Sequence, residues 1–123
     1  MVKETLTVLS IIIQVLLALM FLLAGLPKFT SNQQIEAFKT YGYSQSFRIF
    51  TAVVEVATAL LLIIGIWNQQ SAAIGGFLVF ATMIGAIITH IKLKDSIKNM
   101  VLPIVLLLLG GFVFLENLNV FLG

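Results

Sequence analysis

Four apolar segments, each about 20 residues long, set the strongest constraint on how this chain can fold. A transmembrane helix needs about 20 mostly apolar residues to cross the hydrocarbon core. The segments lie at about residues 6–26, 47–67, 72–91 and 101–121. Each must be helical, because backbone groups without hydrogen bonds are costly in lipid. The sequence therefore predicts an all-α integral membrane four-helix bundle, with residues 1–123 forming a single transmembrane domain.

The composition supports a membrane location and excludes several functions. Hydrophobic residues make up 60% of the chain and charged residues 10%, whereas a soluble domain is about half apolar and about a quarter charged. The chain has no cysteine, which excludes disulfides, thiol redox chemistry and the thiol-oxidising class of four-helix membrane proteins. A net charge of +2 is too small to indicate a nucleic-acid partner.

The first segment has a second interpretation, as a cleaved signal peptide. Its apolar run is longer than the typical h-region of about 7–15 residues, and no small-x-small cleavage site follows it. We therefore expect it to be a transmembrane helix.

The longest connection, residues 27–46, is expected to contain a short interfacial helix. Ser31 with Gln34 three residues later is a capping-box pattern, Ile35 and Phe38 fall on one helix face, and Gly42 lies where the helix would end. This pattern is typical of an amphipathic helix at the membrane surface. An ordinary polar loop is the alternative.

The positive charges predict an orientation. An even number of spans puts both termini on one side and the loops 27–46 and 92–100 on the other. Six of the seven Lys and Arg residues lie on the loop side, and only Lys3 lies on the side of the termini. Positively charged loops stay in the cytoplasm. We therefore expect a multi-pass protein of the cell membrane with both termini outside the cytoplasm.

Ionisable side chains within the spans are candidate functional residues, because such groups are rare there and usually face the bundle interior. Glu55 lies well inside the second span. The topology places Lys28, Glu55 and His90 in the same half of the membrane, and Arg48 lies two turns before Glu55 on the same helix face. The sequence predicts that Lys28, Glu55 and His90 form a buried polar cluster, to which Arg48 contributes.

Hydroxyl and amide side chains extend this cluster. Thr51 and Thr58 flank Glu55 on its own helix face, Gln14 lies on the polar face of the first span, and Thr89 precedes His90. Small residues on these faces allow helices to approach closely. The glycine pairs at 75–76 and 110–111 are expected to be close-packing points.

Each candidate also has a structural interpretation. Lys28 is either a snorkelling anchor or half of a charge pair, and His90 is either an interfacial side chain or a cluster member. Glu55 either forms a structural salt bridge or takes part in binding or proton movement. Glu116, Asn117 and Asn119 fit ordinary interfacial polar residues. No metal site is expected, because the chain has one histidine and no cysteine.

Three stretches, "LLAGLPKF", "VVEVATALLLIIGIW" and "MIGAIITHIKLKD", followed by a last apolar span, resemble the DoxX-like family of small four-helix membrane proteins. The resemblance covers nearly the whole chain in order. The matching positions are Gly25, Lys28, Glu55, Gly85, Ala86, Thr89 and His90. Many relatives carry an arginine near the start of helix one, whereas this chain has "LTVLSIIIQ" there. A substrate site that depends on that arginine is therefore in doubt.

The resemblance implies a membrane protein of mostly unassigned activity. Some members are described as small subunits of quinone-linked sulfur oxidation, or as membrane partners of redox-protective enzymes. The favoured hypothesis is a non-catalytic subunit or scaffold of a redox- or stress-related complex, with a quinone-sized pocket near the Lys-Glu-His cluster. No cofactor motif is visible, and a bound quinone is the one cofactor considered. Expected partners are membrane lipid, a partner subunit and further copies of the chain.

Two other functions compete with this hypothesis. The first is a small proton-coupled exporter that uses Glu55, although small multidrug exporters carry their glutamate in the first span. Cationic neighbours would also keep Glu55 ionised. The second is an enzyme in which His90 acts as acid or base beside Glu55. Nothing in the sequence provides a nucleophile or a metal site, so an enzyme is the least favoured reading.

Overall fold

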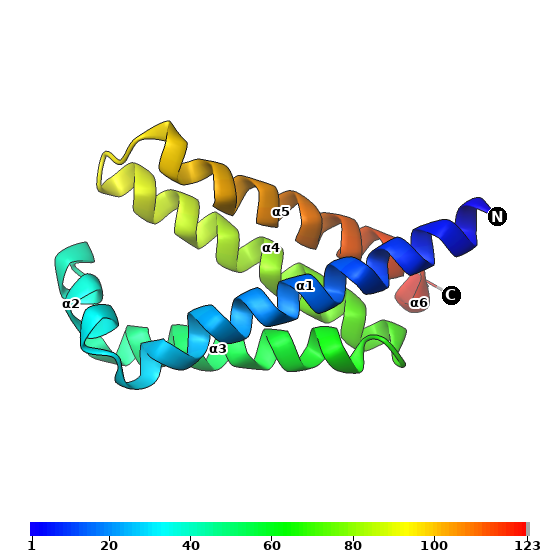
Figure 1. Ribbon diagram of the computed structural model, residues 1–123, viewed down its shortest axis with the longest axis horizontal. Coiled ribbons are helices and arrows are strands. Elements are labelled where there is room, and N and C mark those ends of the chain that lie inside the picture. Colours follow the sequence, from blue (N-terminus) through cyan, green and yellow to red (C-terminus); the bar gives the residue numbers. More distant parts are fainter. Residues whose placement is uncertain (123) are drawn as a thin grey trace.

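The computed structural model describes residues 1–122, and this part of the chain is helical without strands. Within these residues the chain forms four long helices, a short helix between the first two, and a last short helix at the end (Figure 1). The elements are α1 (Val2–Thr30), α2 (Asn32–Tyr41), α3 (Gln45–Ile64), α4 (Gln69–Lys92), α5 (Ile97–Asn117) and α6 (Asn119–Leu122).

The four long helices are long and apolar enough to cross a membrane. At most a third of the residues in each apolar window are buried inside the protein, so most of the apolar side chains face outward. Lipid is the environment in which such a surface is stable. The prediction of a membrane four-helix bundle is confirmed.

The long helices form two antiparallel pairs, α1 with α3 and α4 with α5 (Figure 1). The start of α1, α6 and the α3–α4 turn lie at one end of the molecule, and α2 and the α4–α5 turn lie at the other. We name these the terminal end and the loop end. The first residues of α1 and the last described residues therefore lie at the same end of the bundle.

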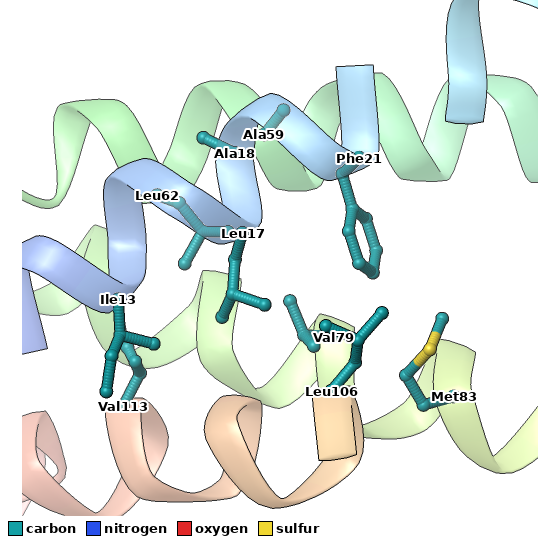
Figure 2. Close-up of a cluster of buried hydrophobic side chains, with 10 residues drawn as sticks. All are labelled: Ile13, Leu17, Ala18, Phe21, Ala59, Leu62, Val79, Met83, Leu106 and Val113. Carbon is teal, nitrogen blue, oxygen red and sulfur yellow. The ribbon is translucent and has the colours of Figure 1, made fainter. Parts of the chain in front are cut away.

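The hydrophobic core lies where the two pairs cross (Figure 2). Leu17 and Phe21 of α1 meet Leu62 of α3, Val79 of α4 and Val113 of α5, and all five are at most 1% exposed. One layer of apolar side chains thus joins all four long helices. In a membrane this layer is stabilised by van der Waals packing between the helices, because lipid tails are as apolar as these side chains.

Close helix contacts occur at three of the four predicted glycines. A Cβ atom at Gly75 of α4 would lie 2.9 Å from Leu62 Cδ2 of α3. A Cβ atom at Gly76 of α4 would lie 2.6 Å from the backbone nitrogen of Phe114, and one at Gly110 of α5 would lie 2.6 Å from Val79 Cγ1. A side chain at either position would push α4 and α5 apart. Gly85 differs, because nothing lies within 4 Å of its Cβ position, and it makes no close helix contact.

The helix bounds differ from expectation at Pro27. The first helix was expected to end near Leu26, but α1 continues through Pro27 to Thr30. Pro27 removes one intrahelical hydrogen bond without ending the helix, because the following turn closes through Ser31 N–H to the Pro27 carbonyl. The additional turn keeps Lys28 helical.

The expected short helix between the first two spans is present as α2. Its C-cap is Gly42, whose φ of 81° is the left-handed conformation that favours glycine. Phe38 is buried, as expected for the apolar face. The capping-box prediction is wrong in one detail, because the Ser31 side chain makes no cap hydrogen bond.

Candidate functional site

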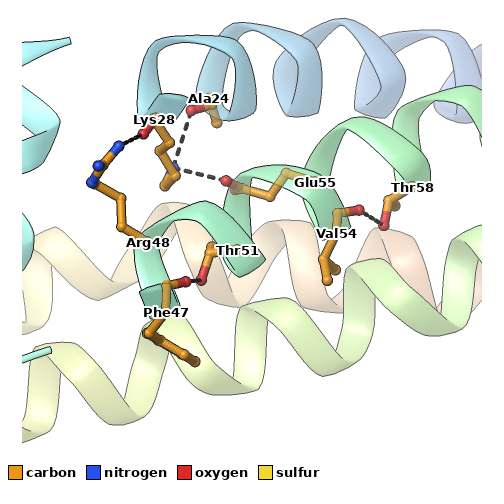
Figure 3. Close-up of polar contacts among 8 residues, drawn as sticks. All are labelled: Ala24, Lys28, Phe47, Arg48, Thr51, Val54, Glu55 and Thr58. Atoms are coloured by element: carbon orange, nitrogen blue, oxygen red, sulfur yellow. Dashed lines mark hydrogen bonds and ion pairs between the residues drawn. The ribbon is translucent and has the colours of Figure 1, made fainter. Parts of the chain in front are cut away.

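Lys28 and Glu55 form an ion pair between α1 and α3 at the loop end (Figure 3). Lys28 Nζ lies 2.9 Å from Glu55 Oε1, and the two side chains are 15% and 6% exposed. The ammonium also donates to the Ala24 carbonyl at 3.1 Å. Glu55 Oε1 is buried and makes no hydrogen bond of regular geometry, so the Lys28 charge is what stabilises it. The predicted pairing of these two residues is present.

Gly25 allows this ion pair to form. A Cβ atom at Gly25 would lie 3.0 Å from Glu55 Cβ and 3.4 Å from the Ala52 carbonyl oxygen. The bare glycine therefore lets the backbone of α1 rest against α3 at the level of Glu55. Lys28, three residues later on the same face, then reaches the carboxylate from the next turn.

Arg48 joins this site through the backbone of α1. Its guanidinium donates to the carbonyl oxygens of Lys28 and Phe29, and its Nε donates to Gln45 Oε1 at 3.0 Å. The last carbonyls of a helix lack partners within the helix and carry partial negative charge. Arg48 supplies both the donors and the opposite charge. We call Lys28, Glu55 and Arg48 the charged clamp.

His90 lies apart from the charged clamp, contrary to the predicted cluster. Its Nδ1 is 2.9 Å from Asp95 Oδ2, and both side chains are about 30% exposed. No hydrogen bond or ion pair joins His90 to Lys28 or Glu55 within residues 1–122. The physical reason is that Asp95, five residues further along in the turn after α4, offers His90 a local partner.

Asp95 is a well-partnered carboxylate. The pKa of Asp95 lies below its ordinary value, chiefly because Asn99 donates a hydrogen bond to it, and because His90 and the Ser96 N–H also donate. These bonds stabilise the ionised form.

The remaining predicted residues are dispersed. Thr51 and Thr58 donate to backbone carbonyls one turn back on α3, at 2.9 and 2.7 Å (Figure 3). Thr89 Oγ1 lies 2.8 Å from the Tyr43 hydroxyl. Gln14 lies toward the terminal end, where it donates to the Leu62 carbonyl at 3.1 Å. These side chains satisfy local or interhelical hydrogen bonds, and none of those bonds is to a side chain of the charged clamp.

Sequence reasoning missed the link between α4 and the α2–α3 connection. Lys92 donates to the Tyr41 carbonyl at 3.0 Å, and its ammonium lies 4.5 Å from the Tyr43 ring centroid. Tyr43 also packs edge-on against Phe47, with ring centroids 5.1 Å apart. The signal in the sequence that could have indicated this link is the pair of tyrosines on either side of Gly42.

The chemistry open to the charged clamp is electrostatic. The described residues contain no group of three or more His, Cys, Asp or Glu side chains that could hold a metal ion. The clamp consists of one carboxylate and two cations, each directed at a group of the chain itself. Such an arrangement fixes the relative positions of α1 and α3.

The fold and this site define a class, a small multi-pass membrane protein with an ion-paired helix bundle. The chain belongs to the DoxX-like family, whose pattern matches residues 12–113. It is also 37% identical over 82 residues to the uncharacterized protein YdgD of Bacillus subtilis (strain 168), covering 66% of this chain and 72% of the relative. No solved structure matches the chain.

Proposed function

We propose that this protein is a non-catalytic membrane subunit or scaffold of a redox- or stress-related complex, in which the charged clamp stabilises the shape of the bundle. The observation that carries the proposal is the 2.9 Å contact between Lys28 and Glu55, with Arg48 on the carbonyls at the end of α1. The charges buried at the loop end are matched within the chain. The family resemblance supplies the redox or stress association.

Proton-coupled export through Glu55 is the alternative function. A carboxylate that exchanges protons for cations has to be free of its own cation during each cycle. Here Glu55 is 5% exposed and lies against the Lys28 ammonium. This geometry favours a structural carboxylate over an exchanging one.

We further propose that both termini face outside the cytoplasm in the cell membrane. The loop end carries Lys39, Lys92, Lys94 and Lys98 together with the charged clamp, whereas the terminal end has Lys3 as its one Lys or Arg. The positive-inside tendency supports this orientation.

Purification in mild detergent tests the scaffold role. Wild type should copurify with a partner protein in a constant ratio, and Glu55→Gln should reduce that ratio because the clamp no longer holds α1 against α3. Glu36→Gln is the matched control, since Glu36 forms an exposed surface pair with Lys39 at 3.4 Å.

An organic extract of the purified complex, scanned for quinone absorption, tests the expected cofactor.

Two results would overturn the proposal. One is wild-type protein that purifies without any stoichiometric partner or bound quinone. The other is proton-driven cation flux in proteoliposomes that Glu55→Gln abolishes while the protein stays folded, which would establish the exporter instead.

A further inference from the structure

A second polar site lies at the terminal end, away from the charged clamp. A cavity of about 330 Å³ opens there between α1, the α3–α4 turn and the end of α5. The residues that matter for its chemistry are Lys3, Ser10, Gln14, Trp67, Glu116 and Asn117. Its volume falls at the lower end of the range of small-molecule sites, about 300–1,000 Å³.

The floor of this cavity is an ordered hydrogen-bond network. Asn117 Nδ2 donates to Ser10 Oγ at 3.2 Å, Ser10 Oγ donates to Gln14 Oε1 at 2.7 Å, and Gln14 Nε2 donates to the Leu62 carbonyl at 3.1 Å. Ser10 and Gln14 are 2% and 1% exposed. Buried polar side chains that are fully connected rigidify their surroundings. The cavity therefore has a polar floor held by three helices.

The walls carry one cation and one anion that do not pair with each other. Lys3 and Glu116 both line the cavity, yet neither forms an ion pair within residues 1–122. Two opposite charges that face one space without touching leave room for a ligand between them. A ligand with both a negative and a positive group would match both walls.

The position of the cavity narrows the ligand class. Trp67 lines it and is 81% exposed, and exposed tryptophan at the end of a membrane helix is typical of the head-group level. An indole face also attracts ammonium groups. The most abundant zwitterions at that depth are phospholipid head groups that combine a phosphate with an amine.

We propose that the terminal cavity binds a zwitterionic aminophosphate group, with the phosphate at Lys3 and the ammonium at Glu116. The source is either the head group of a phospholipid or a free aminophosphate. The inference does not depend on the scaffold role, because it rests on residues at the opposite end of the bundle.

Trp67 is the chain's one tryptophan, so its fluorescence reports binding in the purified full-length protein. Titration with a short-chain phosphatidylethanolamine should change its emission saturably, at about fivefold lower concentration than the matching anionic phosphatidylglycerol. Glu116→Gln should remove this preference, and Lys3→Met should weaken binding of both lipids. Lys98→Met and Glu36→Gln, which alter exposed charges elsewhere, should leave the titrations unchanged.

A parallel titration with free phosphoethanolamine separates the two sources. Binding as tight as that of the lipid identifies a soluble aminophosphate, and much weaker binding identifies the lipid head group. Equal affinity for the two lipids in wild type would overturn the proposal. So would a preference that survives Glu116→Gln, or no saturable response to either lipid or to free phosphoethanolamine.

Discussion

The guanidinium of Arg48 on α3 donates a hydrogen bond of 3.1 Å to the backbone carbonyl of Phe29, in the last turn of α1. The chain between these residues contains all of α2, so this contact closes the α1–α2–α3 connection. The carbonyl would otherwise lack a partner, because it lies at a helix end. Arg48 is 7% exposed. Its charge therefore interacts with groups of the protein and not with solvent.

Replacing Arg48 should loosen the end of α1. Arg48→Ala leaves the Lys28 and Phe29 carbonyls without a donor, which we expect to cost about 1–3 kcal/mol. Hydrogen exchange of the backbone amides in residues 28–34 should accelerate, while exchange in α5 stays constant. Lys39→Ala, which removes an exposed cation from α2, is the control. Equal exchange in Arg48→Ala and wild type would contradict the contact.

Glu55→Ala should be strongly destabilising. It leaves the Lys28 ammonium buried without a counter-charge, and breaking a buried pair on one side costs about 3–5 kcal/mol. The double variant Lys28→Met, Glu55→Ala should recover part of this loss. Unfolding in detergent, followed by helical circular dichroism, measures both. A double variant no more stable than the single one would show that the two charges are not coupled.

Substitutions at Gly25 of α1 and Gly85 of α4 can be compared directly, because the first glycine is closely packed and the second is not. Gly25→Ala places a methyl group 3.0 Å from Glu55 Cβ, which should separate α1 from α3 and cost about 1–3 kcal/mol. Gly85→Ala meets open space and should leave stability unchanged or raise it by less than about 1 kcal/mol. The same unfolding assay compares them. Similar losses in both variants would argue against the close approach at Gly25.

Asp95 should titrate below its ordinary pKa of 3.8, because Asn99, His90 and the Ser96 N–H stabilise its ionised form. A lowered folded-state pKa means that this contribution to stability is present above pH 3.8 and is lost as the pH falls through the lower value. Asn99→Ala should raise the pKa back toward 3.8. Carboxyl chemical shifts of Asp95 measured against pH by NMR test this. A midpoint unaffected by Asn99→Ala would refute the assigned cause.

Cysteine labelling tests the orientation, since the chain contains no cysteine of its own. Gln70→Cys, in the first turn of α4 at the terminal end, should react with a membrane-impermeant maleimide in intact cells. Asn32→Cys at the loop end should react only after permeabilisation. The two sites are both exposed, so access alone distinguishes them. The reverse labelling pattern would place the termini in the cytoplasm.

Several features of this protein follow from its sequence, because lipid restricts which backbone structures and which unpaired charges are stable. The apolar runs had to be helices, since a membrane offers no other partners for their backbone groups. Glu55 and Lys28 were recognisable as partners because ionisable residues in a span need a counter-charge and the topology puts both in one half of the membrane. Gly42 likewise marked the end of α2 through its conformation.

Other features were decided only by the tertiary structure. Side-chain partners depend on how helices cross and rotate, and no spacing along one helix reveals that. His90 therefore pairs with Asp95 in the adjoining turn and not with Glu55. Asn117 meets Ser10 across 107 positions of sequence, because α5 returns to the end of the bundle where α1 begins. That return places the polar floor and the two unmatched charges around one cavity.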